Sequence, residues 1–243
     1  MIRTRIAVAL VILLATVIRS ALGFGEALVA VPLLALMLPV EVAAPVAVLV
    51  SITVALIGVV LDWTEVQARS AGRLVLATLP GIPLGLLLLK AVAEPVVKGV
   101  LGVVIILFSL YALAGKRQQR LRDDRLAWVF GFVAGILGGA YGMNGPPLAV
   151  FGALRGWRPA HFRATLQGYF LPASIIGMFG YWMAGLWTPA VNTFYLISLP
   201  AVFAGIVLGR AITRRLNAQR FVLCVNAALI AIGGILLVQA WRF

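Results

Sequence analysis

Long apolar runs, separated by short stretches of charged residues, glycine or proline, follow one another along almost the whole chain. Ten runs are present, at 6–21, 26–38, 42–61, 73–89, 96–115, 126–141, 146–154, 164–183, 190–209 and 221–240. A helix needs about 20 apolar residues to cross the hydrocarbon core of a bilayer. The pattern therefore predicts an all-α polytopic membrane protein with about eight to ten membrane helices and no sizeable soluble domain.

The second run in each half of the chain is too short to cross a membrane. Runs 26–38 and 146–154 contain 13 and 9 residues, which give helices of only about 20 and 14 Å at 1.5 Å per residue. Each follows a glycine-containing interruption, Gly23-Phe24-Gly25-Glu26 or Gly142-Met143-Asn144-Gly145-Pro146-Pro147. Interrupted backbone at membrane depth is tolerated only where it is buried in protein or lines a polar cavity. We expect short broken or re-entrant helices at the centre of the protein.

The two halves of the chain also match one another. An offset of 119 residues, followed by one insertion, aligns glycine, proline, tryptophan and basic positions: Gly23 with Gly142, Gly58 with Gly177, Trp63 with Trp182, Pro80 with Pro200, Gly85 with Gly205 and Lys90 with Arg210. The matches predict an N-terminal repeat at 1–115 and a C-terminal repeat at 126–243, joined by a basic connector at 116–125.

Basic residues indicate how these repeats are oriented. Fourteen lysines and arginines lie in the connections 62–73, 116–125, 155–163 and 210–220, whereas the other connections and the termini hold five. Cytoplasmic loops of membrane proteins are enriched in such residues. We therefore expect connector 116–125 in the cytoplasm, both termini outside, and an inner (plasma) membrane location. The two halves then have opposite orientations, which is the inverted-topology repeat of many transporters.

Composition supports a membrane protein and removes several other classes. Hydrophobic residues make up 63% of the 243 residues and charged residues 11%, which excludes a soluble globular protein. The net charge of +13 is explained by the loop arginines, so no nucleic-acid partner is expected. One cysteine and one histidine, Cys224 and His161, argue against a metal site, and no cofactor is expected. The N-terminus resembles a signal peptide, but Arg19 at the far end of its apolar run favours a first membrane segment.

Helices that begin near Glu26 and Pro146 would present free N–H groups and positive dipole ends to an anion at the interruptions. Gly23, Gly25, Gly142 and Gly145 permit close backbone approach, and Pro146 suits a first helical turn. These residues are candidate anion ligands. The alternative is that the glycines and prolines only allow tight helix packing.

Arg19 and Glu26 are charged residues close to the first interruption. A buried arginine is costly unless it is paired, so Arg19 is a candidate cation for a substrate anion or for Glu26; alternatively it reaches a membrane interface. Glu26 is a candidate proton-coupling residue, a carboxyl group that gains and loses a proton during transport. It would otherwise be a static ion-pair partner or a helix cap.

Uncharged polar residues inside the apolar runs are weaker candidates. Asn144 lies within the second interruption and is the best placed of them to donate a hydrogen bond to an oxyanion. Polar residues in membrane helices more often bridge neighbouring helices, and we expect this of Ser51, Thr53, Gln167, Asn192 and Tyr195. His161 is expected in a cytoplasmic loop.

Several of these segments resemble the TauE/SafE family of sulfite exporters and toluenesulfonate uptake permeases. The resemblance covers nearly the whole chain and is carried by Gly23-Phe24-Gly25 with Pro32, Gly138-Gly139, Gly142, Gly145-Pro146-Pro147 and Phe162-Arg163-Ala164-Thr165. It implies export or uptake of sulfur-containing anions such as sulfite or organosulfonates, driven by the proton gradient. The first family signature usually continues with glycine where this chain has Glu26, which leaves an altered substrate or proton coupling as possibilities.

The resulting prediction is a secondary transporter of small sulfur-containing oxyanions, working by alternating access in the lipid bilayer and coupled to protons. An intramembrane enzyme acting on lipid phosphates would need clustered acids and a nucleophile or metal, which the membrane runs do not offer. A membrane partner subunit without transport activity is a further alternative. The sequence leaves open the identity of the anion, the direction of transport and the oligomeric state.

Overall fold

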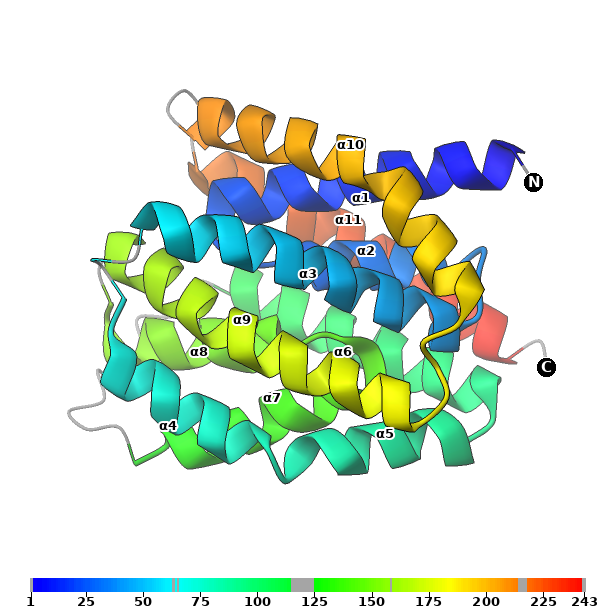
Figure 1. The fold of residues 1–243 in the computed structure, drawn as a ribbon, viewed down its shortest axis with the longest axis horizontal. Coiled ribbons are helices and arrows are strands. Elements are labelled where there is room, and N and C mark those ends of the chain that lie inside the picture. The colour runs from blue at the N-terminus through cyan, green and yellow to red at the C-terminus, as the bar shows by residue number, and fades with distance from the viewer. Residues whose placement is uncertain are drawn as a thin grey trace.

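A computed structural model describes residues 2–62, 64, 66–114, 125–157, 159–213 and 218–241. Over these residues the fold is entirely helical (Figure 1). The helices are α1 Ile2–Leu22, α2 Glu26–Ala35, α3 Val40–Asp62, α4 Ala68–Thr78, α5 Gly81–Ala91, α6 Glu94–Leu113, α7 Ala127–Tyr141, α8 Gly145–Arg155, α9 Pro159–Met183, α10 Pro189–Thr213 and α11 Ala218–Trp241. The all-α prediction is therefore confirmed. Connector residues 116–124 and Trp63 lie outside the described residues.

Four of the described helices are long and apolar enough to cross a membrane, namely α1, α3, α6 and α10. A fifth crossing is added if the bent pair α4 and α5 is counted as one span. Three helical segments are apolar but shorter, among them α2 and α7. The protein is thus a multi-pass membrane protein.

The run at 73–89 was predicted as one segment, and the structure divides it. Helix α4 ends at Thr78, α5 begins at Gly81, and their axes differ by 43°. Pro80 lies in this bend; a proline cannot donate the helical hydrogen bond and its ring clashes with the preceding turn. The Thr78 hydroxyl also donates to the Leu74 carbonyl at 2.8 Å, an interaction that often bends helices.

The long helices run roughly side by side and pack in pairs (Figure 1). Helix α1 packs along α10, α6 along α11, α3 along α9, and both α4 and α5 pack along α7. Glycines allow the last contact to be close, since a Cβ on Gly135 would lie 3.0 Å from the Gly81 Cα atom. Small residues at such spacings let helix backbones approach each other within membranes.

This pairing supports the predicted repeat. In the predicted repeat, α1 corresponds to α7, and α10 corresponds to the bent pair α4 and α5. The packing of α1 against α10 is therefore equivalent to the packing of α7 against α4 and α5. Helices α3 and α9, and likewise α6 and α11, pack on their own counterparts. The repeat and the boundaries 1–115 and 126–243 stay predictions.

The short helix α2 runs back in the direction opposite to α1, and α8 runs back in the direction opposite to α7 (Figure 1). Helix α1 begins at the end where α11 finishes, and α2 runs back toward that end; α7 and α8 do the same from the opposite end. Eight of the ten residues of α2 are buried. The interruptions are therefore turning points inside the protein, as expected for re-entrant helices.

Candidate functional site

The two glycine-containing interruptions lie next to each other. Gly23, Gly25 and Gly142 have φ angles of 88°, 98° and 66°, a region that glycine enters readily and other residues rarely adopt. A Cβ on Gly145 would lie 3.9 Å from the Gly25 backbone nitrogen. Residues 23–25 and 142–144 are thus brought face to face, although 119 positions separate them in the chain.

Short helices begin at both interruptions. Helix α2 begins at Glu26, as predicted, and α8 begins at Gly145, one residue before the predicted start at Pro146. Between them is a narrow gap of about 20 Å³, lined by Arg19, Gly25, Glu26, Ala27, Leu28, Ser51, Gly142, Asn144, Gly145, Pro146 and Phe170. Such a volume holds about one water molecule. Every predicted site residue except Gly23 lines this gap.

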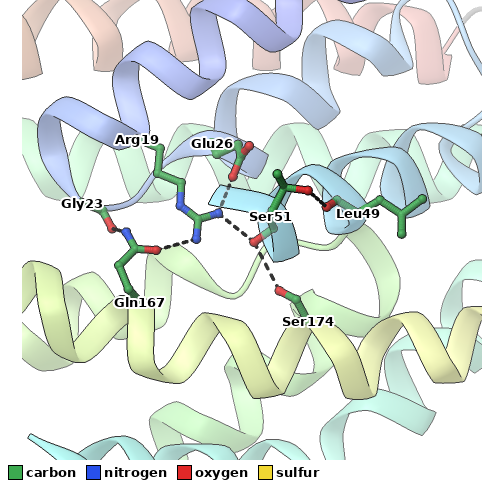
Figure 2. A network of polar contacts seen from close by, with 8 residues as sticks. Arg19, Gly23, Glu26, Leu49, Ser51, Gln167 and Ser174 are labelled. Atoms are coloured by element: carbon green, nitrogen blue, oxygen red, sulfur yellow. Dashed lines mark hydrogen bonds and ion pairs between the residues drawn. The ribbon is translucent and has the colours of Figure 1, made fainter. Parts of the chain in front are cut away.

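Arg19 and Glu26 form a buried ion pair at the first interruption (Figure 2). Both residues are 2% exposed. Arg19 lies in the last turn of α1 and Glu26 is the first residue of α2, so the turn at Gly23 and Gly25 brings them together. A charge this deeply buried needs a counter-charge and hydrogen bonds. The pairing of Arg19 with Glu26 was one of the two alternatives that the sequence left open for this arginine, and it is the one that the contacts favour.

Three further residues surround the Arg19 guanidinium group, and Figure 2 shows two of them, Ser51 and Gln167. It donates to the Ser51 hydroxyl at 2.7 Å through Nη1 and to Gln167 Oε1 at 2.8 Å through Nη2. The Phe170 ring centroid lies 4.8 Å from its Cζ atom, a cation–π distance. The Arg19 charge is therefore held by contacts from α2, α3 and α9.

Gln167 links this arginine to the backbone of the first interruption. Its Nε2 donates to the Gly23 carbonyl at 3.3 Å while its Oε1 accepts from Arg19. Ser174, also on α9, donates to Ser51 at 3.2 Å. Ser51 and Gln167 were expected only as general helix bridges. In the sequence each is a polar residue within an apolar run, and this pattern does not indicate that Arg19 is its hydrogen-bond partner.

Asn144 connects the second interruption to the bend between α4 and α5. Its Nδ2 donates to the Tyr169 hydroxyl at 3.2 Å, and that hydroxyl lies 2.7 Å from Thr78 Oγ1. Asn144 is 7% exposed and makes no side-chain cap bond to α8. Its amide therefore borders the gap while it is held by a neighbouring helix.

A larger cavity of about 310 Å³ adjoins the first interruption. It is lined by Arg19, Ser20, Gly23, Val54, Ile57, Gly58, Arg163, Gln167, Ile206 and Arg210. Arg19 lines both this cavity and the narrow gap. The arginine consequently separates an open space that a small anion could enter from a gap that is too small to hold one.

The remaining candidates lie away from these spaces. Thr53 and Tyr195 share a 2.8 Å hydrogen bond between α3 and α10, as expected of helix-bridging residues. Asn192 is exposed and accepts from Trp187 Nε1. His161 lies in the first turn of α9 rather than in a loop, because that helix begins earlier than its apolar run.

Comparisons with known proteins identify the family of this chain. The model of the family "Sulfite exporter TauE/SafE" matches residues 8–236. A curated protein from Cupriavidus necator, "Probable sulfite/organosulfonate exporter TauE", is 29% identical over 155 residues, which are 62% of this chain and 58% of that protein. The chain thus matches little more than half the length of this relative. No solved structure matches it. Because the family model spans nearly the whole chain, the protein belongs to the sulfite exporter TauE/SafE family.

Proposed function

We propose that the protein is a secondary transporter of small sulfur-containing anions, such as sulfite or organosulfonates, in the inner membrane. Its substrate would bind between the two interruptions. The observation that carries this proposal is the buried Arg19–Glu26 pair placed where two re-entrant helices begin. The family match and the name of the Cupriavidus necator relative support the substrate class.

The residues at the interruptions suit an anion. Arg19 supplies a permanent positive charge, and the first turns of α2 and α8 supply backbone N–H groups with positive dipole ends. Asn144 Nδ2 adds a neutral donor beside the gap. Gly25, Gly142 and Gly145 keep the gap free of side chains, Gly23 allows Arg163 to pack closely at the first interruption, and Pro146 lies in the first turn of α8 without an unmet N–H group.

Glu26 supports coupling to protons. An anion that replaced Glu26 beside Arg19 would leave the carboxylate buried without its cation, which is costly. A proton on the carboxyl group would remove that unpaired charge. The empty site and the site holding a monovalent anion and a proton would then both be neutral. We infer that one proton and one anion occupy the site together.

The small volume of the gap supports alternating access. About 20 Å³ cannot hold a sulfite or sulfonate ion, so the interruptions must separate for substrate to bind. In transporters built from inverted repeats, one repeat rocks against the other about a central site. We propose this movement for repeats 1–115 and 126–243, with both termini outside and connector 116–125 in the cytoplasm.

Transport by the purified protein in proteoliposomes tests this function. We expect saturable uptake of labelled methanesulfonate that unlabelled sulfite inhibits. Arg19→Met should lower the rate about a hundredfold, the equivalent of about 3 kcal/mol for lost charge-assisted hydrogen bonds. The matched control is Arg69→Met, because Arg69 is exposed on α4 and lines no described cavity. Uptake by Arg19→Met equal to that of Arg69→Met would refute the assignment.

A further inference from the structure

The 310 Å³ cavity beside the first interruption carries its own cationic side chains. Arg163 on α9 and Arg210 on α10 line it together with Arg19. No carboxylate is among its lining residues in the part of the chain that the structure describes. Arg163 and Arg210 therefore add two guanidinium groups to the one that Glu26 pairs.

The dimensions of the cavity suit a small oxyanion with some of its water. A water molecule occupies about 30 Å³ in the liquid, so about 310 Å³ exceeds the volume of one sulfite or sulfonate group several times. Arg210 is exposed, so the cavity reaches the protein surface. In this conformation the cavity is large enough for such an ion, whereas the gap between the interruptions is not.

Two glycines that line the cavity, Gly23 and Gly58, allow its polar residues to pack closely. A Cβ on Gly23 would lie 3.0 Å from the Arg163 Cβ atom and 3.1 Å from its Cα atom. A Cβ on Gly58 would lie 3.0 Å from Gln167 Cγ. Larger residues at either position would displace Arg163 or Gln167. The packing thus places the Arg163 backbone directly against Gly23, one turn beyond Arg19.

We propose that this cavity is a second anion-binding site, in which Arg163 and Arg210 bind a sulfite, sulfonate or sulfate group before it replaces Glu26 beside Arg19. Guanidinium groups bind such oxyanions through paired N–H donors. Gln167 and Ser20 line the same space and add polar groups that carry no charge. Binding at this site is independent of transport, whereas its role as the first stop of a substrate rests on the proposed function.

Isothermal titration of the purified protein with methanesulfonate at low ionic strength tests the site. Arg163→Gln/Arg210→Gln should raise the dissociation constant at least tenfold, because two charge-assisted contacts are lost. The control Arg69→Gln changes one charge on an exposed residue outside the cavity and should stay within twofold of the parent. A double variant that binds as tightly as the parent would overturn the proposal, and so would a parent that binds no methanesulfonate.

Cysteine labelling gives a second readout that does not require tight binding. Cys224→Ser removes the single cysteine, and Ser20→Cys then places a thiol in the cavity lining. An anionic methanethiosulfonate should react faster than its cationic counterpart, and the ratio should fall at least threefold when Arg163 and Arg210 are also changed to glutamine. An unchanged ratio in that variant would contradict a cationic site.

The two proposals fail separately. A parent protein that moves no methanesulfonate in proteoliposomes, yet binds and labels as expected, would refute the proposed function and keep the cavity site. A transporting parent whose double variant binds and labels like the parent would refute the cavity site and keep the function.

Discussion

The Arg19–Glu26 pair predicts a large, non-additive effect of substitution on stability. Arg19→Met leaves a buried carboxylate without a cation, and Glu26→Gln leaves a buried guanidinium group without its counter-charge, in contact with neutral groups such as Ser51, Gln167 and Phe170. Removing one partner of a buried ion pair costs about 3–5 kcal/mol, whereas removing both is often close to neutral. Both residues are 2% exposed, so water can compensate little of that cost. We expect each single variant to lose about 3–4 kcal/mol of unfolding free energy.

The double variant Arg19→Met/Glu26→Gln should recover most of this loss, giving a coupling energy of at least about 3 kcal/mol. Reversible unfolding of the purified protein in mixed micelles measures all four members of the cycle. The double variant should fold but transport no anion, since it lacks the substrate-binding cation. Additive losses in the double variant, about 6–8 kcal/mol together, would refute the view that the two charges stabilise each other.

Two further predictions concern the interruption at Gly142 and its attachment to the bend between α4 and α5. Gly142→Ala should cost about 1–3 kcal/mol of unfolding free energy, because the φ of Gly142 is 66° and the new Cβ would lie 2.8 Å from Val48 Cγ2. Gly177→Ala is the control, since nothing lies within 4 Å of its Cβ position. An equal loss in both variants would contradict the argument that backbone strain and crowding at Gly142 cause the loss. Thr78→Val should cost about 1–2 kcal/mol, because it removes the hydrogen bonds of the Thr78 hydroxyl to Tyr169 and to the Leu74 and Gly131 carbonyls. The same unfolding assay measures this loss, and a change below about 0.5 kcal/mol would show that these bonds together contribute nothing.

The positions of the interruptions were predictable because they rest on local chemistry. Glycine and proline restrict or free the backbone wherever they occur, so the starts of α2 and α8 followed from the residues around Gly25 and Pro146 to within one position. Run lengths likewise indicated that α2 and α8 are short, but they did not single out α7, which is also among the shorter apolar helices. The bend after Thr78 was missed, although Pro80 was visible, because prolines at Pro32, Pro172 and Pro200 lie inside continuous helices.

The partners of Arg19 were only partly predictable. Glu26 is seven residues away and follows a turn, so its pairing was among the possibilities that the sequence left open. Gln167 lies 148 positions away, and contact with it depends on how α9 packs against α1 and α3. Arg163 and Arg210 were interpreted as loop charges that set orientation, and only the three-dimensional packing places them in the same cavity as Arg19.

The central claim is that Arg19 exchanges Glu26 for the substrate while Glu26 takes up a proton. The most direct measurement is proton movement that depends on methanesulfonate, recorded in proteoliposomes with the parent protein and with Glu26→Gln. Methanesulfonic acid is a strong acid, so methanesulfonate carries no proton of its own near neutral pH. The account predicts about one proton per anion in the parent and anion movement without protons, or no movement, in Glu26→Gln. Equal proton movement with substrate in both proteins would contradict it.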